Sequence, residues 1–167
     1  ARGFLANGRR GALATVVTTW GSSPRPVGSL LAVAEGGAFV GSVSGGCVEG
    51  AVVSEADAII KGAPAKLLTF GITNEEAWDV GLACGGKVEI FVAPLAGSDA
   101  ALKKVADAQA KSQGAVLATD LASGAITALI DGAIGNDPLG VAALAALNDD
   151  ISRTVDIGGR QIFLDVF

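Results

Sequence analysis

The sequence contains no histidine, no methionine and no tyrosine, and only two cysteines among its 167 residues. The missing histidine excludes Ser-His-Asp and Cys-His nucleophile arrangements, and it removes the usual imidazole ligands of metals. Two cysteines are too few for a four-thiolate zinc site or for the disulfide framework of a secreted domain. We therefore expect no zinc and no haem, and free or redox-active thiols in a reducing cytoplasm. The absence of methionine indicates a piece of a longer protein.

Positive charge and long apolar runs are also scarce. Twelve Lys and Arg against seventeen Asp and Glu give a net charge of −5, and the cations are spread thinly along the chain. Nucleic-acid binders usually concentrate cations on one face, so we expect no nucleic-acid partner. No apolar run reaches the roughly 18 residues that a membrane span needs, and no signal-peptide pattern opens the chain. We expect no membrane span.

The remaining composition, half apolar and 17% charged, is typical of a densely packed globular domain. Strand-like and helix-like segments mix without strict βαβ alternation, which predicts a single mixed α/β (α+β) domain with one mixed sheet and flanking helices. Motif-like residues crowd into residues 1–95, whereas residues 96–167 read as an α/β extension packing on the same domain. The expected strands are 12–20, 29–34, 38–43, 66–70, 87–92, 114–121, 125–131, 152–156 and 161–166, and the expected helices are 47–61, 98–112 and 138–147, with a helical turn in 74–80.

Each cysteine is enclosed by glycines. Residues 44–49 (SGGCVE) follow a strand-like run and open a helix-like run, and residues 81–86 (GLACGG) precede another strand. A strand, a glycine pair and a helix N-terminus together can hold an anion, and Cys47 near that positive end favours its thiolate. The alternative is that Cys47 is a small buried residue where helix and sheet pack tightly.

Cys84, taken alone, is more typical of a glycine turn that tolerates a cysteine. Together with Cys47 it could form a shared thiol site that holds a soft metal, accepts a sulfur atom or forms a reversible disulfide. We then expect both thiols in neighbouring loops, within reach of one ligand. Four carboxylates near these loops are candidate acids or bases, although each is more typical of a solvated surface charge: Glu49, Glu75, Glu76 and Asp79.

The loop at residues 21–28 (GSSPRPVG) offers serine hydroxyls, glycine amides and one guanidinium between two prolines. The planar fork of Arg25 suits a phosphate or a carboxylate. The alternative is a rigid surface turn with a solvated arginine. If the loop is functional, Arg25 should project toward the same cleft as the cysteines.

Residues 20–28, 44–49 and 81–86 together resemble the N-terminal domain of the XdhC/CoxI family, accessory factors of xanthine-dehydrogenase-type and carbon-monoxide-dehydrogenase-type molybdoenzymes. On this resemblance we expect these 167 residues to lack the Rossmann-like C-terminal domain of full-length members. The resemblance implies a maturation factor, rather than an enzyme, that binds molybdenum cofactor (molybdopterin), protects it, and assists its sulfuration and its insertion. The implied partners are an apo molybdoenzyme of the xanthine dehydrogenase family, a cysteine desulfurase and a second copy in a homodimer.

On this resemblance the anionic tail of the cofactor would lie on Arg25, Ser44, Gly45 and Gly46. Cys47 and Cys84 would face the metal end, as possible molybdenum contacts and as the candidate catalytic pair. An alternative is a thiol-dependent sulfur transferase or redox enzyme using both cysteines, and a third is a scaffold for dimerisation or docking. The full set of expected cofactor-binding residues is Ser22, Ser23, Arg25, Gly28, Ser44, Gly45, Gly46, Cys47, Glu49, Cys84, Gly85 and Gly86.

Overall fold

The computed structural model describes residues 10–71 and 86–167. Contacts divide the chain into two compact units, Ala1–Ala96 and Gly97–Phe167, called here the N-terminal and the C-terminal unit. The predictions for Cys84 and Gly85, for three of the candidate carboxylates, and for a helical turn in 74–80 lie outside the described residues. No helix in the described ranges is long and apolar enough to cross a membrane.

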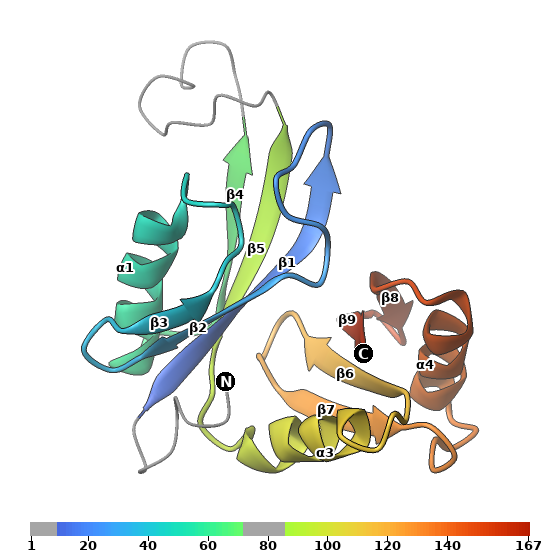
Figure 1. Cartoon of the computed structure of the whole chain (residues 1–167). Helices are drawn as coiled ribbons and strands as arrows, with labels where there is room; N and C mark the ends of the chain where they lie inside the picture. Colours follow the sequence, from blue (N-terminus) through green and yellow to red (C-terminus); the bar gives the residue numbers. More distant parts are fainter. Residues whose placement is uncertain (1–9, 72–85) are drawn as a thin grey trace. The chain divides into compact units, whose positions relative to one another are not determined.

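The N-terminal unit is a five-stranded sheet with one helix on one face (Figure 1). Alternate strand residues, among them Val16, Leu31 and Ile90, meet one stripe of the helix, which includes Val52 and Ile59, in a buried core. The strand order is β3-β2-β1-β5-β4, and the elements are β1 (Gly11–Trp20), β2 (Leu30–Ala34), β3 (Phe39–Gly41), α1 (Glu49–Ile60), β4 (Lys66–Gly71) and β5 (Lys87–Pro94).

A β-bulge in β1 sets the direction of the last residues of that strand. The register against β5 shifts between Val16 and Thr18, so Trp20 pairs with Lys87. An unshifted strand would place Trp20 on the core face that carries Val16, because strand side chains alternate. The bulge turns Trp20 to the other face, where 73% of its surface is exposed at the start of the loop 21–28.

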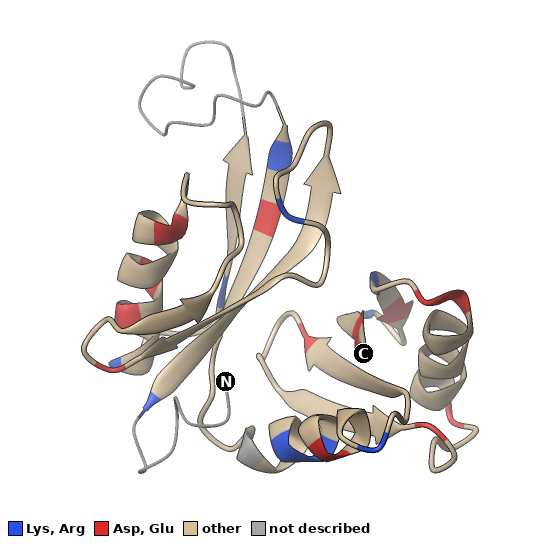
Figure 2. Cartoon of the chain, in the orientation of Figure 1, with Lys and Arg blue, Asp and Glu red and all other residues tan. Residues whose placement is uncertain are grey.

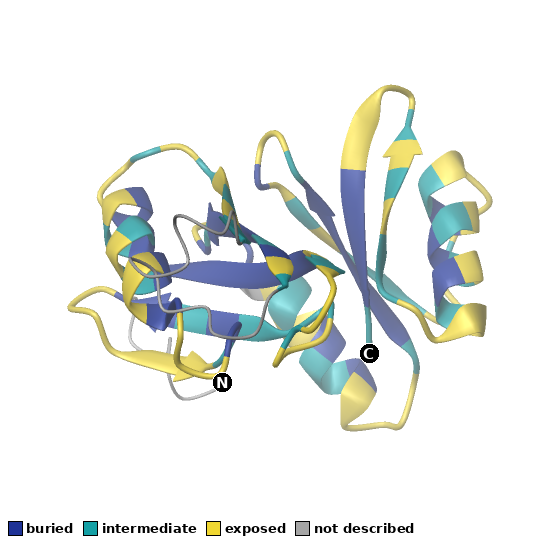
Figure 3. Ribbon diagram, turned by 90° about the horizontal axis from the view of Figure 1, so that it is seen from above, coloured by how far each residue is buried: buried dark blue, intermediate teal, exposed yellow. Residues whose placement is uncertain are grey.

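The C-terminal unit is a four-stranded sheet with a helix on each face. Residues of β6 alternate between the two layers: Ala115 and Leu117 pack with α3, and Val116 and Ala118 pack with α4. Figure 3 shows burial concentrated on the strands and on the inward sides of the helices. The strand order is β7-β6-β9-β8, and the elements are α3 (Asp99–Gln109), β6 (Ala115–Asp120), β7 (Ile126–Ile130), α4 (Pro138–Asp149), β8 (Arg153–Ile157) and β9 (Arg160–Val166).

The mixed α/β class is confirmed, but the expected mixed sheet is wrong. All described strand pairs are antiparallel. Most pairs join strands that follow each other in the chain, and a parallel neighbour would need a long crossover that these connections do not supply. Helix α1 begins at Glu49 rather than at Cys47, so the cysteine lies in the turn that precedes the helix.

Candidate functional site

Two loops and the residue before β5 meet at one end of the N-terminal sheet: residues 21–28 after β1, residues 42–48 after β3, and Gly86. Arg25 Nε donates a hydrogen bond of 3.3 Å to Ser42 Oγ, which joins the first two loops. A Cβ placed on Gly45 would lie 3.6 Å from Cβ of Pro24, and a Cβ on Gly86 would collide with the carbonyl oxygen of Ser22. Gly86 therefore lets the strand β5 begin directly against the first loop.

The turn at residues 42–48 is organised around the side chain of Glu49. Glu49 Oε1 accepts hydrogen bonds from Ser42 Oγ at 2.7 Å, from Val43 N at 3.1 Å and from Ser44 N at 2.9 Å. Its Oε2 accepts from Gly46 N at 2.8 Å and from Ser44 Oγ. We call this arrangement of residues 42–46 around the carboxylate the Glu49 nest.

Glu49 is 8% exposed and is held in its charged form. Burial by itself would raise the pKa of Glu49, but the hydrogen bonds from the hydroxyls of Ser44 and Ser42 and from the backbone N–H of Ser44 lower it to about 2. The expectation that Glu49 is a solvated surface charge is therefore wrong. A buried carboxylate is tolerated here because five donors replace its water.

Further hydrogen bonds close the turn. Gly45 N donates to Ser42 Oγ at 3.0 Å, and Val48 N donates to Ser44 Oγ at 2.9 Å. Gly45 and Gly46 have φ values of 74° and 116°, in the left-handed region that favours glycine. The turn is thus preformed, and the hydroxyl of Ser44 closes it at Val48.

Cys47 is exposed on this turn. The alternative that it is a buried packing residue is therefore wrong, because its neighbour Val48 fills that place with 1% exposure. Arg25 is also exposed, and its own carbonyl oxygen accepts a hydrogen bond of 2.8 Å from Ser23 Oγ. The hydrogen bond from Arg25 to Ser42 then tethers the guanidinium to the turn that carries Cys47.

The Glu49 nest shows that the turn in residues 44–49 binds a carboxylate of the chain itself. The amides of Ser44 and Gly46 were expected to face an external anion, but each donates to Glu49. The sequence carried a signal for this arrangement, because a carboxylate three residues after Gly46 has the spacing with which a capping box reaches back. Ser22 is exposed, and Ser23 and Gly28 are half-buried in the first loop. Around the site, charges of both signs are scattered rather than gathered in one patch (Figure 2).

Comparisons with known proteins agree with the first two of the three motifs, residues 20–28 and 44–49. Residues 4–71 match the model of the XdhC and CoxI family. A stretch of 91 residues, 54% of this chain and 28% of the relative, is 33% identical to the molybdenum cofactor insertion chaperone PaoD of Escherichia coli (strain K12).

The fold is similar to that of a crystal structure described as a xanthine dehydrogenase from Bacillus halodurans, with a TM-score of 0.67. The match covers 98% of this chain and 51% of the chain in that crystal structure. The sequence identity is 17%, so this likeness shows the fold alone. The chain thus spans about half or less of the length of these relatives.

Proposed function

We propose that this chain, whose residues 4–71 match the model of the XdhC and CoxI family, is the part of a chaperone that holds molybdenum cofactor before its insertion into a molybdoenzyme of the xanthine dehydrogenase family. The likeness to PaoD supports the cargo and the task. The structural observation that carries the proposal is one loop cluster that presents an exposed thiol and a tethered guanidinium.

The two side chains suit the two ends of the cofactor. Molybdenum with its sulfur ligands is soft, and a thiolate such as that of Cys47 is a soft ligand. The pterin carries a phosphate, and arginine binds phosphate through a planar fork of donors. The hydrogen bond from Arg25 to Ser42 uses Nε, so among the described contacts both Nη groups remain as donors toward a phosphate.

The Glu49 nest argues against the glycine amides as the phosphate site. Its carboxylate is a resident anion, and a phosphate beside it would be repelled in a partly desolvated place. We therefore assign the anionic tail of the cofactor to the loop at residues 21–28, which carries Arg25 and is called here the Arg25 loop. Ser44, Gly45 and Gly46 then shape the turn that presents Cys47 and do not bind the phosphate. Glu49 is then a positioning residue: it fixes the turn that presents Cys47 and, through Ser42, the tether of Arg25.

An open site also suits a protein that must release its cargo. Cys47 and Arg25 are both exposed, so an apo-enzyme could approach the cofactor while it is still bound. The same exposure favours the second candidate function, a sulfur carrier. There the thiolate of Cys47 would attack the terminal sulfur of a cysteine desulfurase persulfide, form Cys47–S–SH and release the desulfurase thiolate.

A titration with molybdenum cofactor tests the proposal. Trp20 stands exposed at the start of the Arg25 loop, so its fluorescence reports binding there. Cys47→Ala and Arg25→Gln should each weaken binding roughly tenfold or more, since each removes a metal contact or a charge-assisted hydrogen bond. Arg10→Gln is the matched control, because Arg10 is exposed in the same unit and pairs with Glu35 at 2.6 Å.

Unchanged affinity in both site variants would refute the assignment of the site. A sulfur carrier is recognised separately, by the mass increment of one sulfur atom on Cys47 after incubation with a cysteine desulfurase and cysteine. Its appearance without any binding of cofactor would favour the second function over the first.

A further inference from the structure

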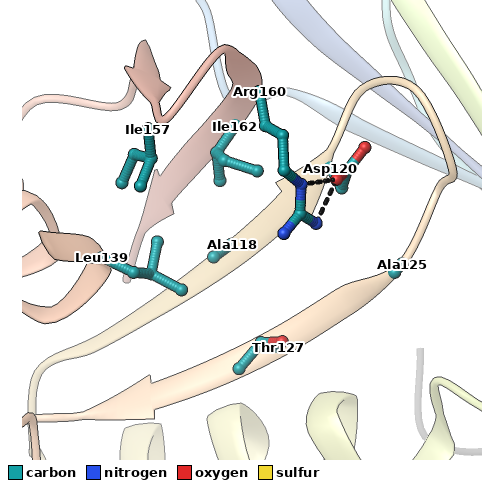
Figure 4. A pocket seen from close by; sticks show the side chains of 8 residues that line it. All are labelled: Ala118, Asp120, Ala125, Thr127, Leu139, Ile157, Arg160 and Ile162. Carbon is teal, nitrogen blue, oxygen red and sulfur yellow. Dashed lines mark hydrogen bonds and ion pairs between the residues drawn. The ribbon is translucent and has the colours of Figure 1, made fainter. Parts of the chain in front are cut away.

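The C-terminal unit contains a pocket of about 170 Å³ on the sheet face that carries α4 (Figure 4). Helix α4 covers this face only from its first turn onward, where Leu139 packs on the sheet. Beyond Leu139, the floor of the pocket is lined by Ala118 of β6, Ile157 of β8 and Ile162 of β9. The small side chain of Ala118 gives the pocket its depth.

Asp120 and Arg160 form the polar side of this pocket, although they are 40 residues apart in the chain. Asp120 Oδ1 accepts hydrogen bonds from Ala122 N at 2.8 Å and from Ser123 N at 2.9 Å. Its Oδ2 accepts from Arg160 Nε at 2.8 Å and from an Nη group of the same side chain. The residue Asp120 is 6% exposed, and the donation from Ser123 and Arg160 lowers the pKa of its carboxyl to about 2.

Asp120 therefore fixes an otherwise exposed arginine at the mouth of the pocket. The side chain of Arg160 is 66% exposed, and such a long side chain would normally sample many rotamers. Here two of its five N–H groups are held by Asp120. Figure 4 shows the remaining guanidinium nitrogen directed away from Asp120, toward the space in front of Ala118 and Leu139.

Arg160 also keeps N–H donors for a second acceptor. Two backbone amides donate to Asp120, so this carboxylate does not depend on Arg160 alone for its hydrogen bonds. The N-terminus of α4 offers no competing anion site, since the side chain of Asp137 already accepts from Leu139 N and Gly140 N at 3.0 Å. The donors that face a guest are thus Arg160 and the hydroxyl of Thr127.

We propose that this pocket is a second binding site, which takes a small monocarboxylate with a compact branched apolar body. The apolar floor would cover the body, and Arg160 would bind the carboxylate. At 170 Å³ the pocket is smaller than the roughly 300 to 1,000 Å³ of sites for drug-sized ligands, so the guest is small, with roughly six to eight non-hydrogen atoms. A ligand of this size binds in the millimolar range.

The test is an NMR titration of the whole chain with isovalerate, a branched carboxylate of about that size. Backbone amides of β6, β7 and β9 around the pocket should shift and saturate. Isovaleramide has the same shape without the charge and should bind about tenfold more weakly. Arg160→Gln should weaken isovalerate by a similar factor, and Ala125→Leu should block the mouth without changing any charge.

Arg153→Gln is the matched control, because Arg153 forms a comparable ion pair with Asp149 at 2.8 Å in the same unit and does not line the pocket. The control should bind as the original chain does. Ala125→Leu, an exposed change, keeps the test decisive if Arg160→Gln proves unstable. The proposal is overturned if no saturable shifts arise around the pocket, if the amide binds as well as the acid, or if neither pocket variant weakens binding.

Discussion

The replacement Glu49→Gln tests whether the nest is built on charge or merely on shape. The pKa of Glu49 falls from 4.5 to about 2 on folding, a difference equivalent to roughly 3 kcal/mol in favour of the folded state at neutral pH. Glutamine keeps the shape but brings an NH₂ group against the N–H donors of Val43, Ser44 or Gly46, which leaves at least one of them unpaired. We expect the free energy of unfolding at pH 7 to fall by about 3 kcal/mol.

Urea unfolding followed by tryptophan fluorescence measures this change in the N-terminal unit, since both tryptophans of the chain, Trp20 and Trp78, lie in it. Because the folded pKa of Glu49 is lowered, its stabilisation is complete above about pH 4.5 and disappears as the pH falls toward 2. The difference between variant and original chain should therefore shrink between pH 5 and pH 2. Glu35→Gln, at an exposed ion pair, should leave the free energy of unfolding nearly unchanged. A loss in Glu49→Gln no larger than in this control would refute the reasoning.

Three further predictions follow from single residues. Asp165 is buried, its Oδ2 has no partner among the described groups, and burial raises its pKa to about 6. Its contribution to stability is thus complete below about pH 4 and lost as the pH rises through 6. Asp165→Asn should raise the free energy of unfolding at pH 7 more than at pH 4, by up to roughly 3 kcal/mol, and an equal effect at both pH values would contradict this. Gly86→Ala should cost more than about 2 kcal/mol in urea unfolding, because its Cβ would collide with Ser22. Gly50→Ala, where nothing lies within 4 Å on helix α1, should instead stabilise by about 0.5 to 1 kcal/mol, and similar outcomes for the two glycines would show that the collision is relieved. Cys47 should react with a thiol reagent in the native chain as fast as in urea-unfolded chain; a strongly protected thiol would contradict its exposure.

Local sequence patterns predicted most of the helices and strands. The neighbouring strands expected at 29–34 and 38–43, and at 152–156 and 161–166, are confirmed as paired strands, because a short glycine turn between two strands acts between neighbours in the chain. The antiparallel arrangement of both sheets, in contrast, depends on which strands pair, and the segment patterns do not encode that. The bulge beside Val16 likewise needs a partner strand before it exists, so the exposure of Trp20 was not predictable from its apolar character.

The segments that form the candidate site were predictable from the sequence, but the hydrogen bonds between them were not. The three motifs were expected to converge, and Ser42, Pro24 and Gly86 make the described contacts between them. The amide of Gly46 donates to Glu49 rather than to an external anion, and this depends on the turn folding back onto its own helix. The Asp120–Arg160 pair could not be found from sequence, since it joins strands 40 residues apart. The shared site of Cys47 and Cys84 stays a prediction.

The most direct measurement of the central claim is the amount of molybdenum that stays with the chain when it is loaded with molybdenum cofactor and passed through a gel-filtration column. The original chain and the Arg10→Gln control should retain close to one molybdenum per chain, and the double variant Cys47→Ala, Arg25→Gln should emerge nearly free of metal. Equal molybdenum in the double variant and the control would show that the loop cluster at the end of the N-terminal sheet is not where the cofactor is held.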